Sequence, residues 1–416
     1  ERLAVREGIA LAEKAGFTRF ERGMDLRPGT KVYSSIRGKA LMLAVIGEES
    51  LTNGCVIAAA HVDCPRLDLK QNPMYEDSEL AYFKTHYYGG IKKYQWTALP
   101  LELHGVVALK DGSVVDVSIG KDKNDPQFII TDLLPHLAAD QNKKTLSEAI
   151  TGEGLNILIG SIPESGDGSD RVKLGVMRLL NEKYGITETD FLSAELSAVP
   201  AIEPRDQGLD RSLIGGYGHD DRVCAYAELK AVLELDKPKR TAICILADKE
   251  EIGSEGVSGM KSEAFECFVE DLCDSQNVKL RHCFEKSLCI SADVSNGFDP
   301  NYPEVSEKRN NSKLNYGVTL LKYTGARGKS ESNDASAELI ADIRRILDDN
   351  KVIWQMGELG KVDQGGGGTV AMYMSQRNID TIDAGVPVLS MHAPYEIVAK
   401  LDCYMTYKAV KAVYNS

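Results

Sequence analysis

Five short segments between residues 60 and 392 place metal-binding residue types directly after apolar runs. They supply two histidines and several carboxylates, the ligands expected in a hydrolase that uses two metal ions. No single segment is decisive, but five of them in one chain are the strongest indication of function in the sequence. The segments are Ala60-His61-Val62-Asp63, His219-Asp220-Asp221-Arg222, Ala247-Asp248-Lys249-Glu250-Glu251, Ser291-Ala292-Asp293 and Ser390-Met391-His392.

The first segment pairs a histidine with an aspartate at the end of a predicted strand. His61 and Asp63 are two residues apart, so their side chains can leave the strand on the same side. A ligating imidazole usually donates its second N–H to a carboxylate, and Asp63 is placed to accept it. A capping aspartate beside a buried histidine explains this segment, taken alone, about equally well.

Two acidic pairs follow. Asp220 and Asp221 come after a glycine-rich turn and open a predicted helix, where an aspartate is often only the N-cap. We favour Asp220 as a carboxylate that bridges two metals, with Asp221 as its neighbour. Glu250 and Glu251 follow a buried strand, and adjacent carboxylates repel each other unless cations are present. We assign Glu251 to a metal and Glu250 to the general base.

Asp293 and His392 end two further apolar runs, and each is predicted to complete the ligand shell of one metal. Taken singly, His392 is better explained as an ordinary half-buried histidine. Other catalytic motifs do not fit. The glycines at 365–368 lack the Gly-Lys-Ser/Thr of a phosphate-binding loop, and neither Gly-x-Ser-x-Gly nor His-Glu-x-x-His occurs.

The elements that position these residues follow from the hydrophobic pattern. Continuous apolar runs at 55–62, 241–247, 288–292, 318–323 and 386–391 are typical of strands buried on both faces. Helical patterns occupy 223–235, 262–273, 336–347 and 395–414. This alternation predicts an α/β fold, with a mainly parallel sheet covered by helices on both faces, as in zinc exopeptidases. Ligands bind beyond the carboxyl ends of such strands, where all five segments lie.

The middle of the chain has a different pattern. Alternating residues at 101–109 and 113–119 predict antiparallel strands around a turn at Lys110-Asp111-Gly112. We therefore expect a catalytic domain formed by 1–95 and 205–416, and an inserted β-rich domain at 96–204 that serves dimerisation or caps the substrate site. A chain of 416 residues is long enough for two or three domains.

Composition argues against several classes of partner. A net charge of −13 disfavours nucleic acid, which requires clustered lysines and arginines. No apolar run approaches the roughly 20 residues that span a bilayer, so we expect no membrane partner. Nine cysteines without a Cys-x-x-Cys pair indicate reduced thiols and a cytoplasmic protein. The chain begins at Glu1, without an initiator Met or a signal peptide, so we expect a truncated N-terminus.

The chain resembles the aspartyl aminopeptidase family over nearly its whole length. Glu-Glu-Ile-Gly-Ser followed by Ser-Ala-Asp is the most specific part, and it is shared with the tetrahedral glutamyl aminopeptidases. The resemblance implies a two-zinc exopeptidase with an inserted dimerisation domain, assembled into dimers and a tetrahedral shell of twelve subunits. The matching motifs are Ala60-His61-x-Asp63-x-Pro65, Tyr88-Gly89-Gly90, Pro135-His136-Leu137-Ala138, Asp220, Glu250-Glu251-Ile252-Gly253-Ser254, Ser291-Ala292-Asp293, Pro300-Asn301-Tyr302 and Met391-His392.

By position, the resemblance implies two ligand sets that share one carboxylate. His61, Asp220 and Asp293 would hold one metal. Asp220, Glu251 and His392 would hold the other. It further implies roles outside these sets, which are Asp63 orienting His61, Glu250 as general base, and His136 reaching the substrate across a dimer interface.

The resemblance leaves the first-residue preference open. The family's pocket for an acidic side chain uses a histidine where this chain has Asn296, and a lysine where it has Arg309. Lys313 and Tyr316 are retained. Arg309, Lys313, Tyr316 and His136 are therefore the candidates for gripping an acidic first residue.

We predict an aminopeptidase that removes N-terminal residues, preferably Asp or Glu, from short peptides with a free amino terminus. A metal-bound hydroxide generated by Glu250 would attack the first peptide carbonyl. Two divalent ions are required, with zinc as the default and cobalt or manganese as substitutes. The alternatives are a glutamyl or broader-specificity aminopeptidase, an N-acyl deacylase on the same site, and a catalytically silent metal-binding scaffold.

Overall fold

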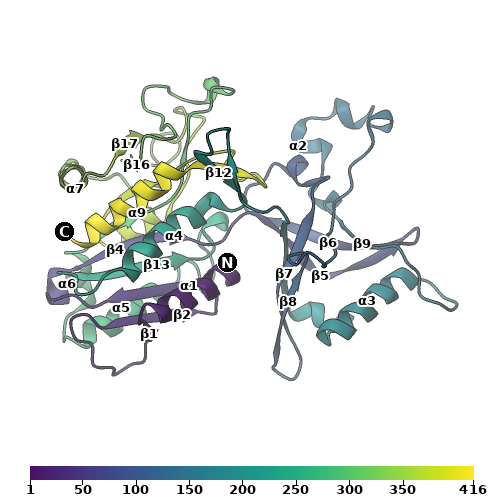
Figure 1. The fold of residues 1–416 in the computed structure, drawn as a ribbon, viewed down its shortest axis with the longest axis horizontal. Coiled ribbons are helices and arrows are strands. Elements are labelled where there is room, and N and C mark those ends of the chain that lie inside the picture. Colours follow the sequence, from purple (N-terminus) through teal and green to yellow (C-terminus); the bar gives the residue numbers. More distant parts are fainter. The chain divides into compact units, whose positions relative to one another are not determined.

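The computed structural model describes residues 1–416, which form two compact units (Figure 1). The first unit comprises Glu1–Cys64, Arg205–Met391 and Glu396–Ser416, and the second comprises Pro65–Pro204 and His392–Tyr395. The sequence places the start of the insertion at residue 96, whereas the second unit already starts at Pro65. The reason is that β5 (Arg66–Asp77) and β6 (Leu80–Tyr88) pair with strands of the second unit.

A nine-stranded sheet forms the centre of the first unit and confirms the predicted α/β class. Its four central strands, β13, β4, β14 and β18, are parallel to one another. Antiparallel pairs join β2 to β3, β3 to β13, and β18 to β16. In spatial order the strands are β1 (Thr18–Arg19), β2 (Lys31–Ile36), β3 (Ala40–Val45), β13 (Thr241–Ala247), β4 (Cys55–His61), β14 (Leu288–Ser291), β18 (Asp380–Gly385), β16 (Val318–Leu321) and β17 (Trp354–Gly357).

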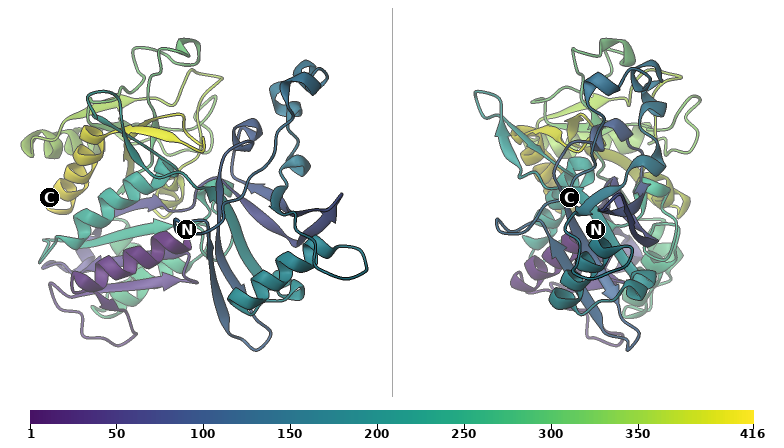
Figure 2. Two further views of the ribbon diagram at one scale, coloured as in Figure 1. Left: turned by 45° about the vertical axis from the view of Figure 1, so that its right-hand side comes forward. Right: turned by 90° about the vertical axis from the view of Figure 1, so that its right-hand side faces the viewer.

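Helices cover both faces of this sheet, because successive side chains of a strand point to opposite faces. In β4, Val56, Ala58 and Ala60 join one buried core, while Cys55, Ile57 and Ala59 join the other. Helix α1 packs against β3 on the first face (Figure 2). The first face carries α1 (Arg2–Lys14), α4 (His219–Leu233), α7 (Ala337–Asp349) and α9 (Lys400–Tyr414), and the second face carries α5 (Ala264–Asp274), α6 (Leu280–Phe284) and α8 (Val370–Gln376).

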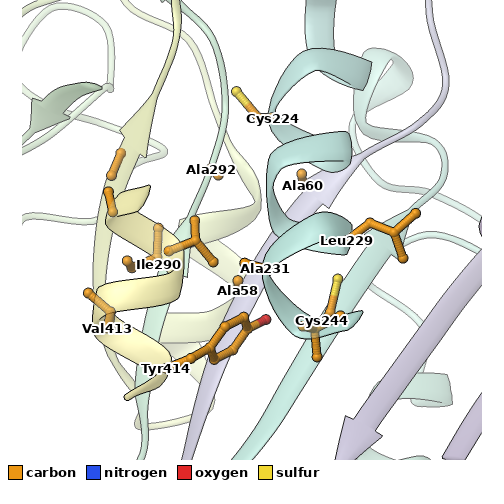
Figure 3. Close-up of a cluster of buried hydrophobic side chains, with 14 of the residues drawn as sticks. Ala58, Ala60, Cys224, Leu229, Ala231, Cys244, Ile290, Ala292, Val413 and Tyr414 are labelled. Atoms are coloured by element: carbon orange, nitrogen blue, oxygen red, sulfur yellow. The ribbon is translucent and has the colours of Figure 1, made fainter. Parts of the chain in front are cut away.

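Small side chains on β4 let two helices approach the strand closely. Figure 3 shows Ala58 and Ala60 beside Ala231 of α4 and Tyr414 of α9. Tyr414 is buried, and its hydroxyl donates to the carbonyl of Ile243 at 2.9 Å. This packing fixes β4, and therefore His61 at its end, against the two longest helices of the first unit.

A second, five-stranded sheet in the first unit corrects one prediction. The run at 386–391 was expected to be a strand of the main sheet, but the main sheet uses β18 just before it. Gly385 ends β18, and the chain then crosses to the smaller sheet, so His392 follows a strand of that sheet. The strands, in spatial order, are β11 (Arg205–Gln207), β12 (Leu213–Gly216), β20 (Glu396–Ala399), β19 (Pro387–Leu389) and β15 (Ser295–Asn296).

The second unit is built on a six-stranded antiparallel sheet, with α3 packed against β5, β6 and β9. Its strand order is β8 (Val114–Ile119), β7 (Leu101–Ala108), β10 (Ala194–Pro200), β5, β6 and β9 (Ile157–Gly160), and its helices are α2 (Leu146–Ala149) and α3 (Arg171–Tyr184). The predicted strands at 101–109 and 113–119 match β7 and β8. None of the helices in the chain is both long enough and apolar enough to cross a bilayer.

Candidate metal centre

His61 is the last residue of β4 and is almost fully buried. Its Nδ1 lies 2.9 Å from the backbone carbonyl oxygen of Asp63, and its Nε2 lies 3.1 Å from Oδ1 of Asp220. Carboxylate oxygens of Glu250 and Asp293 also lie 3.8 and 3.9 Å from Nε2. One ring nitrogen is therefore held by the backbone, and the other faces three carboxylates that come from distant parts of the chain.

Asp63 holds the backbone of the two glutamates. Its Oδ1 accepts the N–H of Glu250 and its Oδ2 accepts the N–H of Glu251, both at 3.2 Å. The Asp63 carboxylate lies 3.5 Å from Nδ1 of His61, farther than the Asp63 carbonyl at 2.9 Å. Asp63 therefore makes the predicted contact with His61 and, in addition, two hydrogen bonds with the backbone of Glu250 and Glu251 that the sequence did not indicate.

The glutamates lie on one turn of 3-10 helix, Glu250–Ile252, which follows β13. Lys249 before the turn and Gly253 after it both have left-handed backbone conformations, with φ of 72° and 83°. The chain therefore reverses sharply at the end of β13. The first N–H groups of a helix have no partner within the helix. The Asp63 carboxylate accepts two of them at this turn, those of Glu250 and Glu251.

Asp220 is buried near the start of α4, where Asp220 and Asp221 depart from helical backbone angles. Its N–H donates to Oε2 of Glu396 on β20 at 3.1 Å. Asp221 is also fully buried, and its carboxylate interacts with the thiol of Cys224. Burial raises the pKa of Asp221 well above its ordinary range, and the nearby Asp293 raises it further.

Asp293 follows β14 and approaches β18 closely. A Cβ atom on Gly385 would lie 1.8 Å from the carbonyl oxygen of Asp293, so only glycine fits at this position. The neighbouring Asp383 of β18 is buried and accepts a hydrogen bond from Thr369 at 2.7 Å. Burial raises the pKa of Asp383 to about 6.

Two sets of three side chains are close enough to share an ion. Within each set, one ligand atom per residue lies within 4.8 Å of the others, and the sets are His61, Asp220 and Asp293, and Asp220, Glu251 and His392. Asp220 belongs to both sets, and Glu250 belongs to neither. These are the groupings that the family resemblance implies, and the ligand roles themselves stay predictions.

The buried carboxylates of this cluster would be stabilised in their charged form by a nearby positive charge. Burial raises the pKa of Glu250 to about 7, opposed by His61 and reinforced by Glu251. Burial likewise raises the pKa of Asp293 well above its ordinary value. Burial alone would lower the pKa of His61, but its hydrogen bonds to Asp220 and Asp63 outweigh burial and raise it. Buried carboxylates with raised pKa values fit a site in which divalent cations replace the bound protons. The His/Asp/Glu donor set suits zinc.

His392 belongs to the second of these sets, whereas the four substrate candidates lie outside both sets. His392 follows Met391 directly, and its Nδ1 lies 2.7 Å from the carbonyl oxygen of Gly90. Three of the four substrate candidates lie between β15 and β16. Arg309 is exposed, and the Lys313 ammonium lies 5.5 Å from the centre of the Tyr316 ring. The fourth, His136, lies exposed on a short 3-10 turn, Pro135–Leu137, of the second unit.

The structure adds Glu396 and Asp383 to the predicted residues. Both are buried, Asp383 within β18 and Glu396 as the first residue of β20. An acid next to apolar residues is the one feature of the sequence that could have identified them. In the glycine run at 365–368, a Cβ on Gly365 would lie 1.8 Å from the carbonyl oxygen of Leu359, so this position packs tightly against backbone.

Comparison with known proteins gives a family match over residues 3–414, to the model described as aminopeptidase I zinc metalloprotease (M18). A probable M18 family aminopeptidase 1 from Clostridium acetobutylicum is 53% identical over 425 residues, covering 100% of this chain and 91% of the relative. The crystal structure of the M18 family aminopeptidase from Thermotoga maritima has a TM-score of 0.96 at 44% identity, covering 100% of this chain and 92% of that one.

Two further solved structures are similar. That of aminopeptidase I from Clostridium acetobutylicum has a TM-score of 0.95 at 51% identity, covering 99% of this chain and 91% of that one. The structure of the S. cerevisiae mApe1 dodecamer has a TM-score of 0.79 at 20% identity, covering 99% of this chain and 93% of that one. At that identity the yeast structure supports the fold alone.

Proposed function

The chain belongs to the aminopeptidase I zinc metalloprotease (M18) family, and we propose that it uses two zinc ions and Glu250 to remove N-terminal residues from short peptides. Family membership confirms the predicted resemblance, since the aspartyl aminopeptidases are the M18 family, and it confirms the prediction of a metallo-aminopeptidase. The number of ions, the roles of individual residues and the preferred first residue are our proposals.

One zinc ion would be held by His61, Asp220 and Asp293, and the other by Asp220, Glu251 and His392. The support is the proximity of the ligand atoms within each set and the presence of Asp220 in both. When bound, such ions supply Lewis acidity, which makes water more acidic and polarises a peptide carbonyl. The sharing of Asp220 is the single observation that carries the proposal, because it brings the two sets together around one carboxylate.

Glu250 would move the proton. Its Oε2 lies 3.8 Å from Nε2 of His61, so it borders the ligand cluster without belonging to either set. Its raised pKa suits a group that takes a proton at neutral pH and returns it. Glu250 would accept a proton from the attacking water and deliver it to the leaving amine, while Asp63 keeps the Glu250–Glu251 turn in place through its two backbone contacts.

An acidic first residue would be recognised by cationic side chains. Arg309 and Lys313 supply positive charge between β15 and β16, next to Tyr316, and His136 would be contributed by the second unit of a partner subunit. Asn296 and Arg309 depart from the family pattern at the positions that would contact this first side chain. The preference for an acidic first residue concerns the rank order of substrates and not the chemistry of the metal site.

The test is a set of initial rates on Asp-, Glu-, Leu- and Lys-anilides, with the protein stripped of metal and then reloaded with zinc, cobalt or manganese. We expect cleavage only after reloading, fastest for Asp and Glu. Cleavage led by Leu or Lys would contradict the acidic preference and leave the metal mechanism intact. Cleavage of N-acyl amino acids in place of anilides would replace the aminopeptidase with a deacylase.

We also propose that the chain acts as a cytoplasmic homo-oligomer, with dimers as the building block of a tetrahedral dodecamer. The support is the exposure of Leu133, Leu134 and Leu137 next to His136. The yeast protein that shares this fold was solved as a dodecamer. Exposed leucines concentrated on one segment are typical of an interface. Size-exclusion chromatography with light scattering would show the mass of twelve chains, whereas a monomer would contradict the proposal.

A further inference from the structure

Residues 311–317, which we call the recognition segment, carry two of the proposed substrate contacts. Lys313 and Tyr316 are both exposed, and the Lys313 ammonium lies 5.5 Å from the centre of the Tyr316 ring. The segment forms no helix or strand before β16 begins at Val318. Its backbone N–H and carbonyl groups therefore need partners elsewhere in the chain. Those partners decide whether the two exposed side chains are held in place.

The side-chain amide of Gln355 pairs with the backbone of Lys313. Its Oε1 accepts the N–H of Lys313 at 2.9 Å, and its Nε2 donates to the carbonyl of Lys313 at 2.8 Å. The same Nε2 lies 3.3 Å from the carbonyl oxygen of Gly317. Gln355 belongs to β17, the last strand of the nine-stranded sheet, where it is paired with Thr319 of β16. One side chain therefore fixes two points of the recognition segment against the sheet.

The carboxylate of Asp402 holds the second half of the segment. Its Oδ2 accepts the N–H of Asn315 and its Oδ1 accepts the N–H of Gly317, each at 2.7 Å. Asp402 is fully buried near the start of α9. Asn315 and Gly317 have left-handed backbone conformations, with φ of 66° and 85°, and a Cβ on Gly317 would lie 2.0 Å from the carbonyl oxygen of Ile353. The turn therefore fits closely between α9 and the chain that leads into β17.

The recognition segment is also tied to the chain that leaves the proposed ligand Asp293. Ser295 is two residues beyond Asp293, and its hydroxyl oxygen lies 3.3 Å from that of Ser312, with both side chains buried. The Ser312 hydroxyl also lies 2.8 Å from the carbonyl oxygen of Asn296. Two residues of extended chain span at most about 7 Å. The segment that carries Lys313 is therefore anchored close to a metal ligand. The first side chain of a peptide must also lie there, because it branches from the carbon next to the carbonyl that is attacked.

We propose that Gln355 and Asp402 are positioning residues that hold Lys313 and Tyr316 in place for an acidic first side chain. The inference rests on the proposed function and names residues that would set its specificity. Both residues act through the backbone, since their side chains bind N–H and carbonyl groups of the recognition segment. A lysine loses much rotational freedom when it grips a ligand. A backbone that is fixed beforehand, with the Tyr316 ring beside the ammonium, lowers this cost of binding.

The test compares substitutions at two glutamines that each accept a backbone N–H. Gln355→Glu keeps an acceptor for Lys313 but replaces the amide donor with an oxygen that faces two carbonyl groups. Gln276→Glu is the matched control, because Oε1 of the half-buried Gln276 accepts the N–H of Leu51 at 2.9 Å, and Leu51 lies before β4, whose far end carries His61. KM and kcat for Asp- and Leu-anilides, and zinc per chain, are measured on the full-length, zinc-loaded protein.

We expect Gln355→Glu to raise KM for Asp-anilide about 3–10-fold, the factor that one lost hydrogen bond is worth. The kcat for both anilides, the KM for Leu-anilide and the zinc content should stay unchanged, and Gln276→Glu should alter none of these quantities. A fold defect without a positioning role would instead affect both substrates alike. An unchanged KM for Asp-anilide, equal rises for both substrates, or the same rise in Gln276→Glu would overturn the inference and leave the aminopeptidase intact. Cleavage led by Leu-anilide in the unmodified protein would remove the acidic preference itself, and the inference with it.

Two further measurements keep the inference testable if Gln355→Glu fails to fold. Asp402→Asn retains only one acceptor oxygen and should produce the same selective rise in KM for Asp-anilide, and an equal rise for Leu-anilide would contradict the positioning role. Amide hydrogen exchange on the unmodified, zinc-loaded protein should be slow at Lys313, Asn315 and Gly317, although the Lys313 side chain is exposed. Rapid exchange at these three amides would show that the backbone is not held and would refute the inference.

Discussion

Replacing Asp63 with asparagine should loosen the turn that carries both glutamates. The Asp63 carboxylate accepts two backbone N–H groups at 3.2 Å, and the side chain is fully buried. Asparagine has nearly the same shape but only one acceptor oxygen, so its NH₂ group must face the N–H of Glu250 or Glu251. One hydrogen bond is then lost and one buried donor is left unpaired, which costs about 1–3 kcal/mol of folding stability.

The functional loss should exceed the loss of stability. Glu251 is a proposed ligand and Glu250 the proposed base, and both depend on the position of this turn. Removing a partner that orients ligands typically lowers metal affinity or activity by about 10–100-fold. We expect Asp63→Asn to lose zinc affinity and kcat together, measured by zinc titration of the metal-free protein and by anilide cleavage at saturating zinc.

Asp402 supplies a matched control. It is also fully buried, and it accepts the N–H groups of Asn315 and Gly317 at 2.7 Å each. Asp402→Asn should therefore lose a similar amount of stability in thermal melts while keeping the zinc affinity of the unmodified protein. The reasoning is refuted if Asp63→Asn keeps its zinc affinity and kcat, or if Asp402→Asn loses zinc affinity to the same extent.

Three further predictions concern the packing, the protonation and the specificity of the site. Gly385→Ala places a Cβ 1.8 Å from the Asp293 carbonyl oxygen and should lower zinc content measured by mass spectrometry, whereas Gly328→Ala, with open space around its Cβ, should not. Because the folded-state pKa of Glu250 is about 7 and its ordinary value is 4.5, the zinc-free folded protein binds more protons than the unfolded chain in this range. The thermal stability of the zinc-free protein should therefore fall as pH rises from 4.5 to 7, and zinc should reverse that trend; a rise would contradict the raised pKa. Arg309→Ala should raise KM for Asp-anilide and leave Leu-anilide unchanged, and equal changes for both substrates would exclude a role in gripping an acidic side chain.

Strands with continuous apolar sequence could be predicted closely. The run at 241–247 coincides with β13, and the run at 55–62 extends only one residue beyond β4. Both strands are buried on both faces, so nearly every position is apolar. The ends of the apolar run therefore mark the ends of the strand. His61, Glu251 and Asp293 could be located for the same reason, since each follows such a run, whereas Asp220 follows a glycine-rich turn.

Elements that mix polar and apolar residues were missed. Strand β18 contains Asp380 and Asp383, so its sequence lacks the continuous apolar run by which the other central strands were identified. The carboxylate of Asp383 can be buried because the hydroxyl of Thr369 donates a hydrogen bond to it. Thr369 lies 14 residues earlier in the chain, outside β18, so the hydrophobic pattern of the strand does not reveal this partner. The predicted helix at 395–414 includes strand β20 as well as α9, because α9 follows β20 directly and apolar residues recur through both elements.

The contacts of Asp63 could not be predicted from spacing alone. The distance of two residues from His61 indicates a shared face of the strand, but the backbone of Glu250 and Glu251 reaches Asp63 only through the pairing of β4 with β13. The register of that pairing places Ala247 opposite His61, which brings the turn after β13 beside the turn after β4. Such a juxtaposition is a property of the sheet and not of either segment.

The central claim is that one glutamate binds metal and its neighbour moves the proton, and the pair Glu250→Gln and Glu251→Gln tests it directly. Zinc per chain and the turnover of Asp- and Leu-anilides should be measured for both variants at saturating zinc. We predict that Glu250→Gln retains two zinc ions and loses about 10²–10⁴-fold in kcat, whereas Glu251→Gln loses a zinc ion as well. Unreduced turnover in Glu250→Gln, or the same loss of zinc in both variants, would contradict the account.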